Sequence, residues 1–257
     1  MINVALRTRA LIASGGAVVL GVVLTGCGST DSGDAPAEHK SFALAGKTLT
    51  VESSNTALEI EPADVRKVEV TRRVDGWVVA GNGPDPEWGM QDGTLTLKVK
   101  CRALISDCSA RHQVKVPRGV EVVVESGNGK INASGFDTPL TLRSHNGGVT
   151  IRDSSGKLSL ETHNGTVTAE GISAKSVSAQ SKNGSMRLDF SSVPDLVETQ
   201  SHNGSTVIGL PNGSTTYAVS ATAHNGRVSV EAPRSDDSPH VVKARSNNGR
   251  ITVRNAN

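Results

Sequence analysis

The protein has 257 residues, a length that suits one large domain or two ordinary ones. Its 27 Lys and Arg side chains nearly balance its 25 Asp and Glu side chains, and no basic cluster stands out, which argues against nucleic-acid binding. Three Phe, two Trp and one Tyr against 27 Gly do not suit a helical enzyme with an aromatic pocket, whereas branched aliphatic residues at alternate positions over most of the chain predict an all-β fold.

Residues 1–26 have the features of a secretory signal peptide. Arg7 and Arg9 precede an apolar run over 11–24 that is short for a membrane span but suits a signal core. The run ends in the sequence Leu-Thr-Gly-Cys at 24–27, which resembles the lipobox of bacterial lipoproteins. The resemblance implies cleavage before Cys27 and acyl chains on the thiol and amine of this residue, which would anchor the protein durably in a membrane.

Residues 27–40 are rich in Gly, Ser and Asp and predict a flexible tether behind the lipidated cysteine. We therefore expect the folded part to lie outside the cytoplasm, lipid-anchored at the outer face of the bacterial cytoplasmic membrane.

Residues 41–117 predict an N-terminal β-rich part that caps the rest of the domain. Apolar or alternating stretches occur at 42–51, 56–60, 66–72, 94–101 and 111–116. Trp77 and Trp88 flank the Gly- and Pro-rich segment 81–87. The two tryptophans either cover the open end of the core or form a binding loop, since Trp is enriched at binding hot spots.

The three cysteines fit an exported protein. Without Cys27, an even pair remains, Cys101 and Cys108, separated by a short segment expected to be a loop. This arithmetic predicts a Cys101–Cys108 disulfide. The alternative is a metal site, for which His112 is the one further ligand nearby in sequence.

Residues 118–257 contain seven copies of a Ser/Thr-x-Asn-Gly motif, in one of which Ala223 replaces the hydroxyl residue. Aliphatic residues recur four and six positions before each Asn and three and five positions after it, the inward positions of two strands joined at an Asn-Gly corner. The corner asparagines are Asn128, Asn146, Asn164, Asn183, Asn203, Asn225 and Asn248.

The repeat predicts a β-solenoid, similar to a single-stranded β-helix, with about seven rungs. A single Asn-Gly between alternating strands would indicate a hairpin, so an antiparallel hairpin meander or barrel is the alternative. The constant motif favours the solenoid, in which corners stack about 4.8 Å apart. Gly, and to a lesser degree Asn, tolerates the positive φ expected at the corner. The Asn amides would bond along the axis, and the Ser/Thr hydroxyls would form a second ladder.

The repeats, preceded by the sequence Val-Lys-Val-Pro-Arg-Gly-Val at 114–120, resemble the bacterial β-strand-repeat domains of unknown function that are labelled "putative adhesin". The resemblance covers roughly residues 40–257. It implies the fold and an envelope location, since members commonly follow a lipobox or a membrane segment. A fold does not carry an activity with it, so the resemblance implies no reaction.

The sequence contains none of the common catalytic motifs, and we expect neither an enzyme nor a cofactor. A polysaccharide-degrading enzyme would need acidic residues gathered on one face, whereas the acids of the repeats share no single column. In four of the seven motif copies, the residue before the Asn is a histidine. Sequential rungs would place two pairs of them side by side, either as metal ligands or as polar corner residues without metal. They are His145, His163, His202 and His224.

Together these features predict an envelope lipoprotein whose non-catalytic solenoid is an adhesin-like binding or scaffold surface for an envelope glycan or a surface protein. The alternative is a sensing or regulatory partner of one membrane protein in an envelope-stress system, bound through the Trp77 and Trp88 end.

Overall fold

The computed structural model describes residues 36–255, apart from the side chains of 75–83 and 101–108. The predicted signal peptide, Cys27 and most of the predicted tether lie outside the described residues. The tether prediction ended too late, because Glu38–Phe42 already forms strand β1. Within the described residues, no helix is long and apolar enough to cross a membrane.

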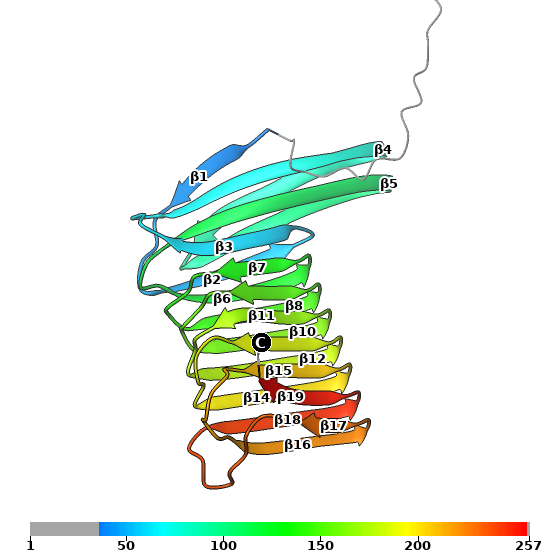
Figure 1. Ribbon diagram of the computed structural model, residues 1–257. Helices are drawn as coiled ribbons and strands as arrows, with labels where there is room; N and C mark the ends of the chain where they lie inside the picture. Colours follow the sequence, from blue (N-terminus) through cyan, green and yellow to red (C-terminus); the bar gives the residue numbers. More distant parts are fainter. Residues whose placement is uncertain (1–35, 256–257) are drawn as a thin grey trace, which may run out of the picture.

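The fold is a stack of two-stranded rungs that form two facing parallel sheets (Figure 1). Each Asn corner joins a strand of one sheet to a strand of the other, and the two strands of a rung do not pair with each other. For example, Leu158 of β10 pairs in parallel with Leu140 of β8 and with Val177 of β12. The predicted β-solenoid is therefore confirmed, and the repeats are not hairpins.

The first sheet consists of the strands that lead into the corners. Its members are β2 (Thr48–Ser54), β6 (Glu121–Asn128), β8 (Leu140–Asn146), β10 (Leu158–Asn164), β12 (Ser176–Asn183), β14 (Leu196–Asn203), β16 (Ala218–Asn225) and β18 (Val241–Asn248). The second sheet consists of the strands that leave the corners. Its members are β3 (Ala57–Ala63), β7 (Ile131–Ser134), β9 (Val149–Arg152), β11 (Val167–Ile172), β13 (Met186–Phe190), β15 (Thr206–Leu210), β17 (Val228–Val230) and β19 (Ile251–Asn255).

The core lies between the sheets, where the predicted aliphatic positions meet. Leu140, Leu142, Val149 and Ile151 of one rung are at most 1% exposed. Each rung buries these side chains against its neighbours above and below as well as across the core, which is why one rung cannot fold alone.

The order of the rungs differs from the order of the sequence at one end. Strand β18 pairs with both β14 and β16, and β19 pairs with both β15 and β17. The last repeat is thus inserted between the two repeats before it, and the β16/β17 rung forms the end of the stack (Figure 1). The connection 231–240 joins β17 to β18 and is long enough for the β16/β17 rung to lie one position further along the stack.

At the other end, three strands close the stack. β5 (Thr94–Pro117) pairs with β2 through Thr94–Lys98 and with β3 through 111–117, and the antiparallel strands β4 (Val68–Gln91) and β1 follow. These strands cover this end of the stack, whereas β2 and β3, which also lie within 41–117, form a rung of their own. The corner of the β2/β3 rung consists of residues 55–56, whereas the equivalent part of β5 consists of residues 99–110. Because of these additional residues, β5 and its partner β4 extend beyond the stack as an arm (Figure 1).

The corner glycines are required mainly for close approach between rungs. A Cβ on Gly165 would lie inside contact distance of the Gly147 carbonyl, and the same holds for Gly147 against Gly129. Of these three, only Gly129 has a φ in the left-handed range, at 129°. The predicted positive φ occurs at four of the seven corner glycines, Gly129, Gly184, Gly204 and Gly249. At the other three, the stacking distance alone explains why no side chain fits.

Candidate functional site

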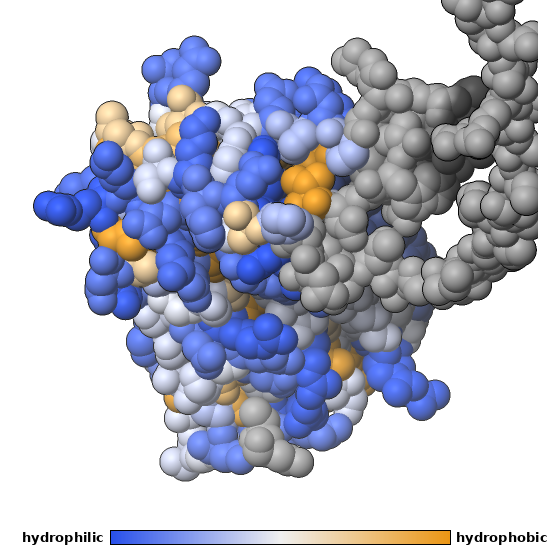
Figure 2. Space-filling view, turned by 90° about the horizontal axis from the view of Figure 1, so that it is seen from above, coloured by the Kyte–Doolittle hydropathy of each residue, from blue (hydrophilic) through white to orange (hydrophobic). Residues whose placement is uncertain are grey.

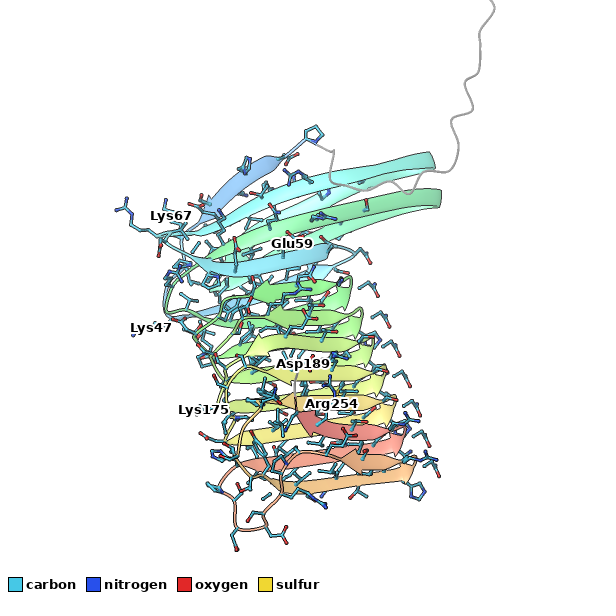
Figure 3. The ribbon with its side chains drawn as sticks, in the orientation of Figure 1. Lys47, Glu59, Lys67, Lys175, Asp189 and Arg254 are labelled. Atoms are coloured by element: carbon cyan, nitrogen blue, oxygen red, sulfur yellow. The ribbon has the colours of Figure 1, made fainter. Side chains whose placement is uncertain are left out.

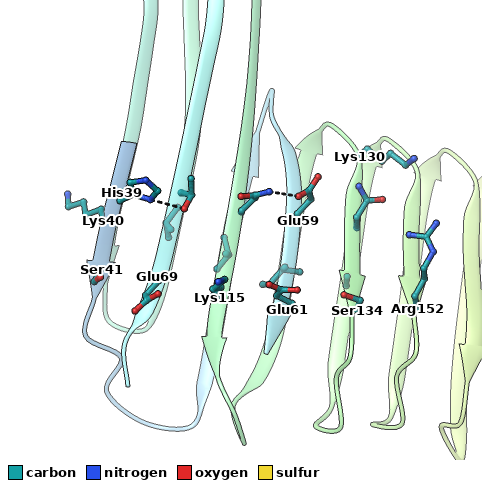
Figure 4. Close-up of a pocket in the computed structure, with 17 residues that line it drawn as sticks. His39, Lys40, Ser41, Glu59, Glu61, Glu69, Lys115, Lys130, Ser134 and Arg152 are labelled. Atoms are coloured by element: carbon teal, nitrogen blue, oxygen red, sulfur yellow. Dashed lines mark hydrogen bonds between the residues drawn. The ribbon is translucent and has the colours of Figure 1, made fainter. Parts of the chain in front are cut away.

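A groove of about 980 Å³ crosses the second sheet at its capped end. It runs over β1, β4, β5, β3, β7 and β9, which lie side by side in that order (Figure 4). Because alternate residues of a strand face the same side, the lining residues form rows across the strands.

One row is joined by hydrogen bonds. The ring Nδ1 of His39 lies 3.0 Å from the hydroxyl of Thr71, and the Gln113 amide donates to Glu59 over 2.9 Å (Figure 4). Asn132 of β7 continues the row beside Glu59. These side chains present amide, hydroxyl and carboxylate groups within one line of the surface.

The second row alternates in charge without forming ion pairs. Register places Lys115 between Glu69 and Glu61, and all three side chains are exposed. Among the described residues, none of the three takes part in an ion pair within 4.0 Å. Arg152 ends the row and is paired with Glu170 at 2.9 Å. The centre of this row thus has both signs of charge available to a ligand.

The rest of the second sheet is also polar. Figure 3 shows Glu59, Asp189 and Arg254 over this sheet, while Lys47, Lys67 and Lys175 lie along the edge formed by the returns. Further from the groove, Arg187 and Asp189 form an ion pair at 2.8 Å.

Trp88 does not lie in a loop, contrary to the binding-loop interpretation of segment 81–87. The segment belongs to β4, and the half-buried Trp88 ring packs edge-on against Phe42 with centroids 6.4 Å apart. The buried Arg72 guanidinium lies 4.0 Å from the Trp88 centroid and pairs with Glu38. Trp88 therefore covers the open end of the core; the side chain of Trp77 lies outside the described residues.

His112 lies in the core beneath this cap and is fully buried. The Thr56 hydroxyl donates to the Ala110 carbonyl over 3.0 Å, so the His112 Nδ1–H donates to the Thr56 oxygen over 2.7 Å. Nε2 has no partner. Burial, and secondarily the nearby Arg72 charge, lowers the pKa of His112 to about 4. His112 is a structural residue here, and nothing in this arrangement makes it a metal ligand.

Only one of the two expected histidine pairs forms. The rings of His145 and His163 stack with centroids 4.8 Å apart. His202 and His224 are not adjacent, because the inserted β18 rung places Asn247 between them. Desolvation, followed by Lys182 and His145, lowers the pKa of His163. In the described part of the chain, no group of three or more His, Cys, Asp or Glu side chains could hold a metal.

Cys101 and Cys108 lie on the two limbs of the arm. Lys98 and Arg111 of β5 pair with Ser54 and Ala57, the residues that flank the corner of the rung below. Cys101 lies three positions after Lys98, and Cys108 lies three positions before Arg111. The loop expected between the cysteines is part of β5. Their side chains are not described, so the disulfide stays a prediction.

The predicted asparagine ladder is confirmed and has one more member than the motif revealed. Each Asn amide donates to the side-chain oxygen of the next Asn at 2.8–3.0 Å, in the order 225, 248, 203, 183, 164, 146, 128 and 55. The sequence motif does not include Asn55, because the residue after it is Thr56 and not Gly. The predicted hydroxyl ladder is wrong, since Thr162 and Ser181 donate to glycine carbonyls rather than to each other.

Comparison with known families agrees with this architecture. The family described as Toastrack DUF4097 matches residues 47–254. The chain belongs to this family. The toastrack match begins just before β2 and ends in β19, so it includes every rung and the arm but leaves out β1.

Solved structures with a similar fold include two bacterial proteins. One is described as a "putative cell adhesion protein" from Clostridium sporogenes ATCC 15579, with 10% identity, a TM-score of 0.37 and coverage of 86% of this chain and 99% of that chain. The other is described as a "putative adhesin" from Bacteroides fragilis NCTC 9343, with 12% identity, a TM-score of 0.49 and coverage of 86% and 97%. No curated protein sequence matches the toastrack chain.

Sequence reasoning missed the groove of this toastrack domain. Its lining comes from β1, β4 and β5 as well as from the repeats, and the pairing among these strands had no motif. The available signal was the alternation of polar and aliphatic residues over 113–116, which marks Gln113 and Lys115 as outward-facing.

Proposed function

We propose that the protein is a lipid-anchored protein of the bacterial envelope whose toastrack domain is a non-catalytic, adhesin-like surface that binds an envelope glycan through the groove over β1, β4, β5, β3 and β7. The observation that supports this most is the row with Lys115 between Glu69 and Glu61, which are exposed and form no ion pair with any described residue. Unpaired charges beside hydroxyl and amide groups suit a polar ligand that carries both donors and acceptors.

The spacing of the groove also suits an extended ligand. Neighbouring strands lie about 4.8 Å apart, so a row across five strands offers a polar group at regular intervals. A repeating polymer can occupy several of these positions at once, and weak contacts then add to a useful affinity.

The test is sedimentation of the purified protein with insoluble cell wall, over a range of wall concentrations. The double variant K115A/E61A removes the central charges, and K243A/E198A is the matched control, because it removes an exposed pair on the other sheet. We expect saturable retention that falls about tenfold in the first variant and is unchanged in the second. No retention, or equal retention of both variants, would contradict the glycan proposal.

Anchoring has its own test. We expect Cys27→Ala to release the protein from the membrane fraction and to abolish incorporation of a fatty-acid label, whereas Cys101→Ala leaves both unchanged. Retention of Cys27→Ala in the membrane fraction would contradict the anchor.

A further inference from the structure

The β16/β17 rung leaves two strand edges open. β16 pairs with β18 on one side and β17 pairs with β19 on one side, and in the described residues no strand covers their other sides. The inward side chains of this rung are only partly covered, among them Val219, Ala221 and Val230. Val228, at 38% exposed, is the one large hydrophobic side chain that is exposed in the described part of the chain.

The unpaired backbone groups of these edges follow from the register. The Ala218 N–H donates to the His240 carbonyl, so alternate residues from Val219 onward direct their N–H and C=O groups away from the stack. In β17, the Arg227 carbonyl accepts from Ile251, so Val228 and Val230 direct theirs outward. An exposed parallel edge of this kind is a template for another strand.

Among the described residues, backbone hydrogen bonds cover this edge at one position. Tyr217 donates to the Pro233 carbonyl and accepts from the Ser235 N–H, and Tyr217 is 1% exposed. From Val219 to the corner at Asn225, the edge of β16 stays open.

The capped end is protected in a way that the β16/β17 end is not. There, inward-pointing cations close the stack: Lys40 lies 5.0 Å from the Phe42 centroid, and Arg72 is buried over Trp88. Seen from that end, the surface is mostly hydrophilic (Figure 2). Inward-pointing charges are a common means of preventing edge-to-edge pairing. The inward residues of β16 and β17 are Val and Ala.

We propose that the β16/β17 end binds the same end of a second copy of this chain, with both strands pairing antiparallel to their own counterparts. A two-fold axis normal to the sheets would pass midway between Thr222 of β16 and its counterpart, and midway between Ser229 of β17 and its counterpart. A single axis can serve both strands, because Thr222 lies three residues before Asn225 and Ser229 lies three residues after Gly226. The proposal goes beyond glycan binding, since the groove lies at the opposite end.

The hydrogen-bonding pattern fits this register. About that axis, Ala221 opposes Ala223 of the second copy, and Val228 opposes Val230 of the second copy. All four residues direct their backbone groups outward, as a hydrogen-bonded antiparallel pair requires. The exposed Val228 side chain would become buried in the same step.

The charges fit it as well. Arg227 would oppose Glu231 of the second copy, twice in the dimer, because the two residues lie symmetrically about Ser229. In the described part of the chain, Arg227 makes no ion pair and lies beside Arg250, while Glu231 accepts only from the Ser229 hydroxyl at 3.1 Å. Arg227, which lies beside the like-charged Arg250, and the Glu231 carboxylate would each gain an oppositely charged partner.

Sedimentation velocity of the full protein over a range of concentrations tests the proposal. We expect a monomer–dimer equilibrium that Arg227→Glu weakens by about tenfold and that the swapped variant R227E/E231R restores. Arg187→Glu, on the same sheet in an interior rung, is the control and should leave the dimer unchanged. A protein that stays monomeric throughout, or a dimer that Arg227→Glu does not weaken, would overturn the proposal.

Cross-linking tests the axis itself. Residue 229 would oppose its own counterpart in a non-hydrogen-bonded pair with Cα atoms about 4.5 Å apart, which is within disulfide range. We expect Ser229→Cys to form a covalent dimer on oxidation, while Thr252→Cys, one rung inward, forms none beyond the wild-type level. Equal cross-linking of both variants would contradict the register.

Discussion

The buried His112 ties the stability of the cap to pH. Its Nδ1–H is bonded to Thr56, and its Nε2 has no partner, so a second proton would place an unpaired charge in the core. Because the pKa of the folded state, about 4, lies below that of an ordinary histidine, the stability is fully present above about pH 6.5 and is lost as the pH falls toward 4.

The expected loss follows from the two pKa values. Between pH 7.5 and pH 5.0, proton binding favours the unfolded state by a factor of about 30, which corresponds to about 2 kcal/mol of unfolding free energy. The assay is urea unfolding at the two pH values for the wild type and for His112→Asn, whose amide can still donate to Thr56. The variant is expected to be less stable at pH 7.5, but its loss of stability on acidification should be about 2 kcal/mol smaller.

His202→Asn is the matched control, because it makes the same substitution at an exposed corner outside the cap. If His112→Asn fails to fold, the ring resonances of His112 in the wild type give an independent result and should remain those of neutral imidazole at pH 5.5. An unchanged pH dependence in His112→Asn, or a His112 that titrates near pH 6.5, would refute the reasoning.

The stack allows three further predictions. Gly165→Ala should lower the unfolding free energy by about 3 kcal/mol, because its Cβ would meet the neighbouring rung's carbonyl, whereas Gly148→Ala, with 3.5 Å to its nearest neighbour, should be tolerated; equal urea midpoints would contradict this. Asn164→Ala removes two ladder hydrogen bonds and should cost about 2 kcal/mol in the same assay, and a loss below about 0.5 kcal/mol would show that the ladder adds little. Thiol titration of the unfolded, unreduced protein should find Cys101 and Cys108 unreactive until a reductant is added, and two reactive thiols would disprove the bridge.

Much of the fold was predictable because the stacking interactions are local in the repeat. Aliphatic residues at fixed distances from each corner define the two inward faces, and the Asn-Gly corner defines where the chain changes sheet. These patterns were enough to predict the parallel stack, the Asn ladder and the buried positions such as Leu142 and Val149.

The candidate site was far less predictable. The groove depends on β5 lying on β3 and on β4 lying on β5, which brings Glu69, Lys115 and Glu61 into one row. Their separation along the chain follows no period, so no pattern in the sequence links them. The sequence shows that Trp88 is an aromatic residue next to a Gly- and Pro-rich segment. Its contact with Phe42 depends on the antiparallel pairing of β1 and β4, which no sequence pattern indicates.

The sequence by itself determined the content of each rung, because inward and outward positions follow from the two-residue period of a strand and from the corner motif. Only the tertiary structure decided which rung lies on which. The β18/β19 rung lies between its two predecessors, which separates His202 from His224 and leaves β16 at the open end. Any two rungs with matching inward faces can stack in register. The order of the rungs therefore depends on the length of the connections between them and on which rung is least destabilised by an exposed face. These are properties of the whole assembled stack and not of any one repeat.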